Sequence, residues 1–132
     1  MLLDAEESQL VLVDYQERLM PAMHDGTAVL ANARRLATAA QLLGVPVWGT
    51  EQNPSRLGPN DPALRALCRD TLAKMEFGAL EEGLGEWLRP AAQKQPQGNA
   101  RSLPRHLQKP AAPERTTIVI AGVEAHVCLL QT

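Results

Sequence analysis

Three residues in separate parts of the chain carry side chains suited to nucleophilic chemistry: Asp14, Lys74 and Cys128. Cys128 follows the apolar run "TTIVIAG" and stands where a helix is expected to begin. The positive end of a helix dipole and free backbone N–H groups stabilise a thiolate and lower its pKa. The alternative is a buried cysteine that packs as a small hydrophobic side chain.

Asp14 and Lys74 each permit a structural and a chemical interpretation. Asp14 ends the apolar run "QLVLVD", where an acid serves either as a cap or as a pocket carboxylate. Lys74 lies in "LAKMEFG", and taken alone it fits a solvated surface lysine. With Cys128 they form a coherent set: a thiol nucleophile, a carboxylate that accepts its proton, and an ammonium that keeps the carboxylate charged and oriented.

The segments around these residues predict a parallel sheet. Apolar runs at 9–14 and 116–122 indicate buried strands, which we expect to be neighbours at the centre of the sheet. Residues 27–43 are apolar at helical spacing, and "VPVWGT" at 45–50 indicates another strand. This order predicts a βαβ unit. Because ligands bind beyond the carboxyl ends of parallel strands, Asp14 and the segment after Gly122 are expected at such a site.

The rest of the chain has weaker signals. Residues 51–62 are rich in Pro, Gly and Asn and read as a loop, followed by a helix at about 62–70 and an extended "LAKMEF". A helix over 79–89 is weakened by Gly83 and Gly85. Residues 90–115 predict a long surface excursion, with a possible short helix near 102–108. The length of 132 residues fits one domain, spanning 1–132.

Composition excludes several functional classes. The net charge is −2 and aromatic residues make up 3%, so neither a basic field nor a base-stacking surface favours nucleic acid. No apolar run approaches the roughly 20 residues that span a bilayer, so no membrane partner is expected. The acidic N-terminus does not fit a secretory signal, and two cysteines fit a reducing cytoplasm better than a disulfide scaffold.

Four segments, in order, resemble the signatures of one family. They are "LVLVDYQERLMPAM", "VPVWGTEQNPSRLGPNDPALRAL", "LAKMEFGAL" and "VIAGVEAHVCLLQT". Each is weak evidence alone, but together they resemble the isochorismatase-like superfamily of cysteine hydrolases, over roughly residues 8–80 and 116–132. The similarity is to the small isochorismatase-domain proteins with a "TEQ…LGP" loop. It implies a three-layer α/β/α, Rossmann-like fold with a central parallel sheet, and a homo-oligomer.

The resemblance also assigns roles. It places the family's catalytic Asp, Lys and nucleophilic Cys on Asp14, Lys74 and Cys128, and a non-proline cis peptide at Val123–Glu124. With that bond, the N–H groups of Glu124 and Cys128 would form an oxyanion hole. The implied reaction is hydrolysis of the C–N bond of a small amide through a Cys128 thioester. Members of the family that cleave isochorismate lack the cysteine, so Cys128 points to amide hydrolysis.

Other residues receive lesser roles. Gln52 and Phe77 flank the family segments and are expected to line the substrate pocket, although Phe77 also fits core packing. The nicotinamidase branch carries Asp and His metal ligands after the second strand, whereas this chain has no histidine there, so neither metal nor cofactor is expected. His126 is read as a pocket-edge or subunit-contact residue or a solvated histidine, and Cys68 as structural.

The chain departs from the family in two places. Residues 90–115 are longer than the family's usual connection into the last strand. We expect them to form a lid, an oligomer contact or a solvated loop. Family domains also continue beyond the nucleophile with further helix and strand units, whereas only "LLQT" follows Cys128, so we expect the domain to lack its C-terminal units. The alternative function is therefore an inactive family member that acts through binding or oligomer contacts. A thiol redox role is disfavoured because no resolving cysteine lies near Cys128 in the sequence.

Overall fold

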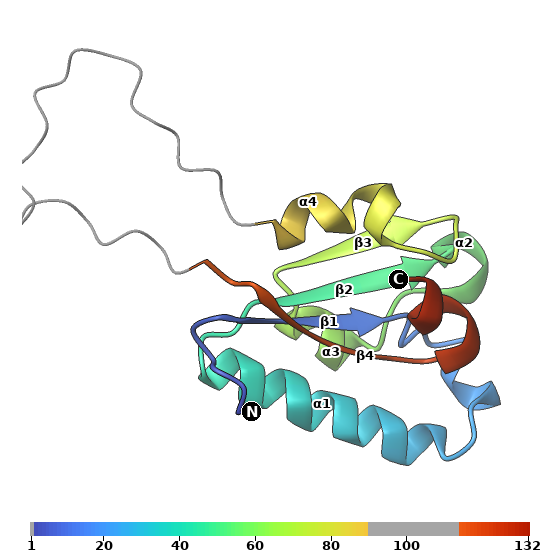
Figure 1. Ribbon diagram of the computed structural model, residues 1–132. Coiled ribbons are helices and arrows are strands. Elements are labelled where there is room, and N and C mark those ends of the chain that lie inside the picture. Colours follow the sequence, from blue (N-terminus) through green and yellow to red (C-terminus); the bar gives the residue numbers. More distant parts are fainter. Residues whose placement is uncertain (1, 90–113) are drawn as a thin grey trace, which may run out of the picture.

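The computed structural model describes residues 2–89 and 114–132. Its frame is a parallel four-stranded sheet in the order β3-β2-β1-β4 (Figure 1). The strands are β1 (Ser8–Val13), β2 (Val47–Gln52), β3 (Asp70–Lys74) and β4 (Thr117–Gly122). The three candidate residues Asp14, Lys74 and Cys128 lie at or beyond the carboxyl ends of these strands. The predicted α/β class with a central parallel sheet is confirmed.

Helical segments cover both faces of the sheet (Figure 1). The helices α1 (Gly26–Leu42) and α3 (Pro62–Leu67) enclose one hydrophobic core with the side chains of Leu10 and Leu12. The segments η2 (Leu80–Leu84), α4 (Gly85–Leu88) and η4 (Ala125–Leu129) enclose a second core with Val11 and Val13. Because successive strand residues face opposite sides, β1 contributes to both cores and is buried throughout.

Local sequence signals account for most of the element boundaries. Gly44 has a φ of 70° directly after α1, a left-handed conformation that glycine adopts without strain. The carboxylate of Asp61 accepts a hydrogen bond from the Leu64 N–H and caps α3, which begins with Pro62. Two short helical segments complete the description, η1 (Met20–Ala22) and α2 (Pro54–Leu57).

The structure differs from the sequence-based expectations in three places. β4 is one of the two outer strands among the four described, with only β1 as a neighbour, whereas β1 and β4 were both expected at the sheet centre. The expected helix over 79–89 is divided into η2 and α4, because Gly83 adopts a φ of 124° that no helix accommodates. β2 extends to Gln52, into the segment expected to be loop. Most of the excursion at 90–115, with the possible helix near 102–108, lies outside the described residues.

Two side chains, Gln9 and Arg115, donate hydrogen bonds that hold the amino end of the sheet together. The amide nitrogen of Gln9 donates to the backbone oxygens of Leu88 at 2.9 Å and of Arg115 at 3.1 Å. Arg115 in turn donates to the backbone oxygens of Ala5, Ser8 and Gly44. The described residues on either side of 90–113 are thus held next to each other. No helix in the described parts of the chain has the length and apolarity to cross a bilayer.

Candidate active site

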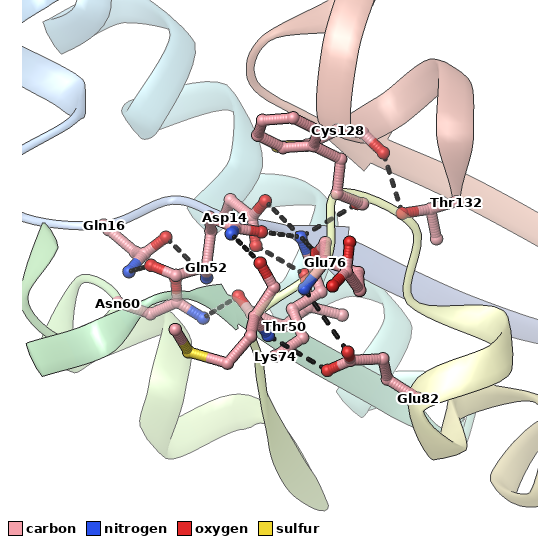
Figure 2. Close-up of polar contacts among 12 residues, drawn as sticks. Asp14, Gln16, Thr50, Gln52, Asn60, Lys74, Glu76, Glu82, Cys128 and Thr132 are labelled. Atoms are coloured by element: carbon pink, nitrogen blue, oxygen red, sulfur yellow. Dashed lines mark hydrogen bonds and ion pairs between the residues drawn. The ribbon is translucent and has the colours of Figure 1, made fainter.

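The fold brings the three candidate residues together at the carboxyl end of the sheet (Figure 2). Asp14 directly follows β1, Lys74 is the last residue of β3, and Cys128 lies in η4, which follows β4. Their exposed fractions are 0%, 1% and 2%, so all three are withdrawn from solvent. The alternative reading of Lys74 as a solvated surface lysine is therefore wrong.

The two oxygens of the Asp14 carboxylate have different surroundings. Oδ1 accepts a hydrogen bond of 2.8 Å from the Thr50 hydroxyl. Oδ2 lies 3.1 Å from Lys74 Nζ, yet among the described residues no donor is aligned on it for a hydrogen bond. Asp14 also has a φ of 58°, a left-handed conformation that aspartate tolerates better than most residues. The chain turns at Asp14, and Oδ2 is left with the ion-pair contact to Lys74 but no hydrogen bond.

The ammonium of Lys74 is held by acceptors around it. Nζ donates to Gln52 Oε1 at 2.7 Å and to the backbone oxygens of Phe77 at 2.9 Å and Glu76 at 3.3 Å. Its three N–H donors therefore have partners other than Asp14. The interaction with Asp14 is an ion pair in which both side chains are 0% exposed. A buried pair of this kind is expensive to break, because either charge alone would be uncompensated.

Cys128 lies near Asp14, whose carboxylate acts on the thiol. Burial, followed by the hydrogen-bonding capacity and the charge of the Asp14 carboxylate, raises the pKa of Cys128 to about 12; Lys74 opposes this shift. The expected depression of this pKa by a helix terminus is therefore wrong, because burial and the neighbouring carboxylate outweigh it. The thiol is protonated at neutral pH, and its proton has a nearby carboxylate to receive it.

Close backbone packing sets the position of the turn that carries Cys128. A Cβ atom on Gly122 would lie 2.5 Å from Val13 Cβ and 2.8 Å from the Val13 backbone oxygen. Only glycine therefore lets β4 approach the end of β1 this closely. The Val123 N–H donates to the same Val13 oxygen at 3.1 Å. The residues leading to Cys128 are thus anchored one residue before Asp14.

The expected cis peptide at Val123–Glu124 is not found: the described residues contain no cis peptide bond. The chain instead reverses through Glu124, which has a φ of 35° and a ψ of 83°. A left-handed residue turns the backbone while keeping the trans bond, which costs less than a non-proline cis bond. The oxyanion hole from the N–H groups of Glu124 and Cys128 stays a prediction.

Gln52 and Phe77, the expected substrate-binding residues, differ in what their side chains contact. The Gln52 amide contacts protein groups at both ends: Oε1 accepts from Lys74, and Nε2 donates to the Met75 backbone oxygen at 2.7 Å. Gln52 therefore supports Lys74 and the segment after it. Phe77 is 49% exposed and lines a cavity of about 640 Å³ with Glu76, Gly78, Leu80, Glu81, Glu82 and Gln131. This cavity adjoins the segment whose backbone oxygens hold Lys74.

Sequence reasoning missed two buried polar residues of the site, Thr50 and Gln16, each 0% exposed. Thr50 donates to Asp14, and Gln16 pairs with the Gln52 backbone through hydrogen bonds of 2.8 Å in both directions. The expected pairing of the strands at 9–14 and 45–50 could have identified Thr50 as a site residue. Val13 is the register partner of Thr50, so in a parallel pair both strands deliver side chains to the same edge. No sequence pattern marks Gln16.

The remaining candidates lie away from these contacts. His126 is exposed, and Cys68 is partly buried and hydrogen bonds to the Leu64 backbone oxygen. Glu51 braces the loop by accepting from the Asn60 N–H and pairing with Arg65. Within residues 2–89 and 114–132, no three His, Cys, Asp or Glu side chains gather as a metal site would require.

This protein has an α/β fold with a thiol, a carboxylate and an ammonium buried at the carboxyl edge of its parallel sheet. The chain belongs to the isochorismatase domain family, which matches residues 8–132. It is 29% identical to isochorismatase domain-containing protein 2 of Danio rerio over 98% of this chain and 55% of that protein. It is 31% identical to protein 2A of Mus musculus over 96% of this chain and 51% of that protein. The chain thus spans about half the length of these relatives.

Solved structures share the fold. The MAR1 ribonuclease of Caenorhabditis elegans has a TM-score of 0.75 and 24% identity, covering 100% of this chain and 58% of that one. The YCAC gene product of Escherichia coli, described as an octameric hydrolase of unknown specificity, has a TM-score of 0.69 and 21% identity. The match covers 96% of this chain and 54% of the YCAC chain. At these identities the likeness concerns the fold.

Proposed function

We propose that this protein is a cysteine hydrolase that cleaves the C–N bond of a small amide. The observation that supports this most is the burial of Cys128, Asp14 and Lys74 together at the carboxyl edge of the sheet, with Asp14 and Lys74 in an ion pair (Figure 2). A protonated thiol beside a carboxylate whose Oδ2 accepts no hydrogen bond has a built-in proton acceptor, and the ammonium keeps that acceptor charged. Since proton transfer and attack both occur at this cluster, the other side chains serve to position it.

The proposed reaction has two halves. Asp14 accepts the thiol proton while Cys128 Sγ attacks the amide carbonyl carbon, and the electron pair of the C=O bond moves to its oxygen. When this tetrahedral intermediate collapses, the C–N bond breaks and Asp14 protonates the leaving nitrogen, which gives an amine and a thioester. Asp14 then takes a proton from water, whose oxygen attacks the thioester. The carboxylic acid leaves, and the proton returns to Cys128.

The surroundings supply two further parts of the proposal. The N–H groups of Glu124 and Cys128 would bind the oxyanion of each tetrahedral intermediate. The cavity beside Phe77 would admit the substrate, with the exposed ring contacting its apolar part. We propose no metal or cofactor for this reaction. We also place the protein in the cytoplasm, because both cysteines are free thiols, as a reducing compartment maintains.

The test uses short primary amides as probes in four proteins: the native chain, Cys128→Ser, Asp14→Asn and, as a matched thiol control, Cys68→Ser. Released ammonia and the mass of an acyl adduct are measured. The native chain and Cys68→Ser should hydrolyse at least one amide and carry the adduct on Cys128, whereas the other two should not. An active Cys128→Ser protein would overturn the proposal, as would a folded native chain that hydrolyses no probe and forms no adduct.

A second candidate is a binding role through contacts between copies, favoured by the apolar surface of β4. Ile118 and Ile120 are 47% and 42% exposed on this strand, and Leu130 beyond it is 76% exposed. We propose that the protein forms a homo-oligomer through this surface. Light scattering should give a mass above one chain, which Ile118→Glu with Ile120→Glu should reduce. A single-chain mass at high concentration would contradict the oligomer.

A further inference from the structure

The central strand β2 contacts both charged members of the site. Thr50 and Gln52 are two residues apart, so their side chains face the same side of the sheet. Thr50 donates to Asp14, which follows the neighbouring strand β1. Gln52 accepts from Lys74, which ends β3 on the other side. Figure 2 shows these contacts converging on the Asp14–Lys74 pair. β2 therefore orients a carboxylate and an ammonium that come from two other strands.

The Thr50 contact is what makes the two Asp14 oxygens unequal. Oδ1 is occupied by the Thr50 hydroxyl at 2.8 Å, whereas Oδ2 has no aligned donor among the described residues. Lys74 Nζ contacts Oδ2 as an ion pair at 3.1 Å outside hydrogen-bond geometry, while it donates hydrogen bonds to Gln52, Phe77 and Glu76. Without the hydroxyl, either oxygen could turn toward the thiol or the ammonium.

The Thr50 hydroxyl is itself held in place. The backbone oxygen of Thr50 accepts from the Asp14 N–H at 3.2 Å and from Asn60 Nδ2 at 3.0 Å. The side chain is 0% exposed, and a β-branched side chain has few accessible rotamers. Thr50 and Asp14 are thus tied together twice, once through the backbone and once through the side chains. The hydroxyl has no solvent with which to exchange this hydrogen bond.

We propose that Thr50 is a positioning residue that directs Asp14 Oδ2 toward the Cys128 thiol as the oxygen that accepts its proton. This inference rests on the proposed function, in which Asp14 is the base. The proton moves from Cys128 Sγ to Oδ2, while the Thr50 hydroxyl keeps its hydrogen bond to Oδ1 throughout. Thr50 itself gives up no proton and touches no substrate.

The Thr50 hydroxyl also affects how the rate of the Cys128 reaction depends on pH. The charged and titratable groups around Asp14 and the thiol are the Lys74 ammonium, Cys128 itself and the Glu124 carboxylate, whose charge acts on the thiol. A hydrogen bond to a carboxylate favours its charged form. If the hydroxyl is removed, the charged carboxylate loses this stabilisation. Because only a charged Asp14 can accept the Cys128 proton, the acid limb of the rate profile of the Cys128 reaction should move to higher pH.

The experiment follows alkylation of Cys128 by iodoacetamide from acidic to mildly alkaline pH, which requires no substrate. All variants carry Cys68→Ser, so that one thiol reacts. Thr50→Val removes the hydroxyl at nearly constant volume, and Thr50→Ser, the matched control, keeps it. We expect the acid limb of the rate profile to move up by about one pH unit in Thr50→Val. The Thr50→Ser profile should overlay the native one. Thr50→Ala repeats the test if Thr50→Val does not fold.

Asp14→Asn separates this inference from the proposed function. Loss of the acid limb in Asp14→Asn identifies Asp14 as the group that controls the Cys128 reaction. If the limb persists there, the proposed role of Asp14 as the base fails. If Asp14→Asn loses the limb but folded Thr50→Val or Thr50→Ala leaves it in place, the role of Thr50 alone is overturned. A shifted profile in Thr50→Ser would also overturn it, because the hydroxyl would then not be the cause.

Discussion

The replacement of Lys74 by methionine tests the buried ion pair most directly. Methionine retains the length and apolar stem of the lysine but removes the charge. The Asp14 carboxylate would then be a buried charge without a counterion, since the two side chains of the pair are both 0% exposed. Three acceptors, on Gln52, Phe77 and Glu76, would also lose their donor. The damage is electrostatic, because little volume changes.

The expected loss follows from these contacts. Removing one partner of a buried ion pair costs about 3–5 kcal/mol. For a chain of this size, each kcal/mol lowers the melting temperature by roughly 3 °C, so Lys74→Met should melt about 10 °C or more below the native protein.

The assay is urea unfolding followed by circular dichroism for Lys74→Met, Asp14→Asn and the double variant. The double variant should lose less than the two single losses combined, by at least about 2 kcal/mol, because it leaves no unpaired charge. The matched control is Arg89→Met, which breaks an ion pair with Glu86 in which both side chains are 73% exposed. This surface pair should change stability by less than about 1 kcal/mol.

Two outcomes would refute this reasoning. If Lys74→Met costs no more than Arg89→Met, the Lys74 ammonium does not compensate the Asp14 charge. If the loss of unfolding free energy in the double variant equals the sum of the two single losses, the two side chains act independently. The 3.1 Å contact then contributes no interaction energy.

Three further predictions follow from other contacts. Gly122→Ala should lose at least about 2 kcal/mol in urea unfolding, because its Cβ would lie 2.5 Å from Val13 Cβ, whereas Gly44→Ala meets no atom within 4 Å and should lose only about 1 kcal/mol; equal losses would contradict this. Alkylation of Cys128 should be slower in Asp14→Asn at neutral pH, because the thiol loses its proton acceptor. It should be faster at alkaline pH, because Asp14 contributes to raising the pKa of Cys128 to about 12; rate profiles that do not cross would count against the interaction of Asp14 with the thiol. Replacing 90–113 with a short Gly/Ser linker should leave the melting temperature nearly unchanged, because Gln9 holds the flanking oxygens together; a large loss would show that the segment contributes to the fold.

The sequence predicted the sheet and its candidate residues well where one physical signal dominated. The apolar runs before Asp14 and Gly122 gave β1 and β4, and helical periodicity gave α1, because burial sets both patterns. The rule that ligands lie beyond the carboxyl ends of parallel strands placed Asp14 and the segment of Cys128 at one edge, whereas Lys74 joined them only through its residue type and the family resemblance.

What sequence could not supply was the balance between competing effects. The pKa of Cys128 depends on burial and on the Asp14 charge, both of which arise only after folding. Gln52 was expected to face substrate, yet its amide is used by Lys74 and Met75, because a buried ammonium needs acceptors from neighbouring strands. The turn at Glu124 uses a left-handed residue where a cis bond was expected, a choice that the letters "VEAH" do not distinguish.

The alternation of side chains along β2 has a consequence for folding fidelity. Thr50 and Gln52 face the buried ion pair, while Glu51 between them faces the opposite side and pairs with Arg65. If β2 paired with its neighbours one residue out of register, Glu51 would move into the site beside Asp14. Two buried carboxylates would then share one ammonium, and Arg65 would lose its partner. The charges at this edge thus also penalise misregistered sheets and favour correct strand pairing.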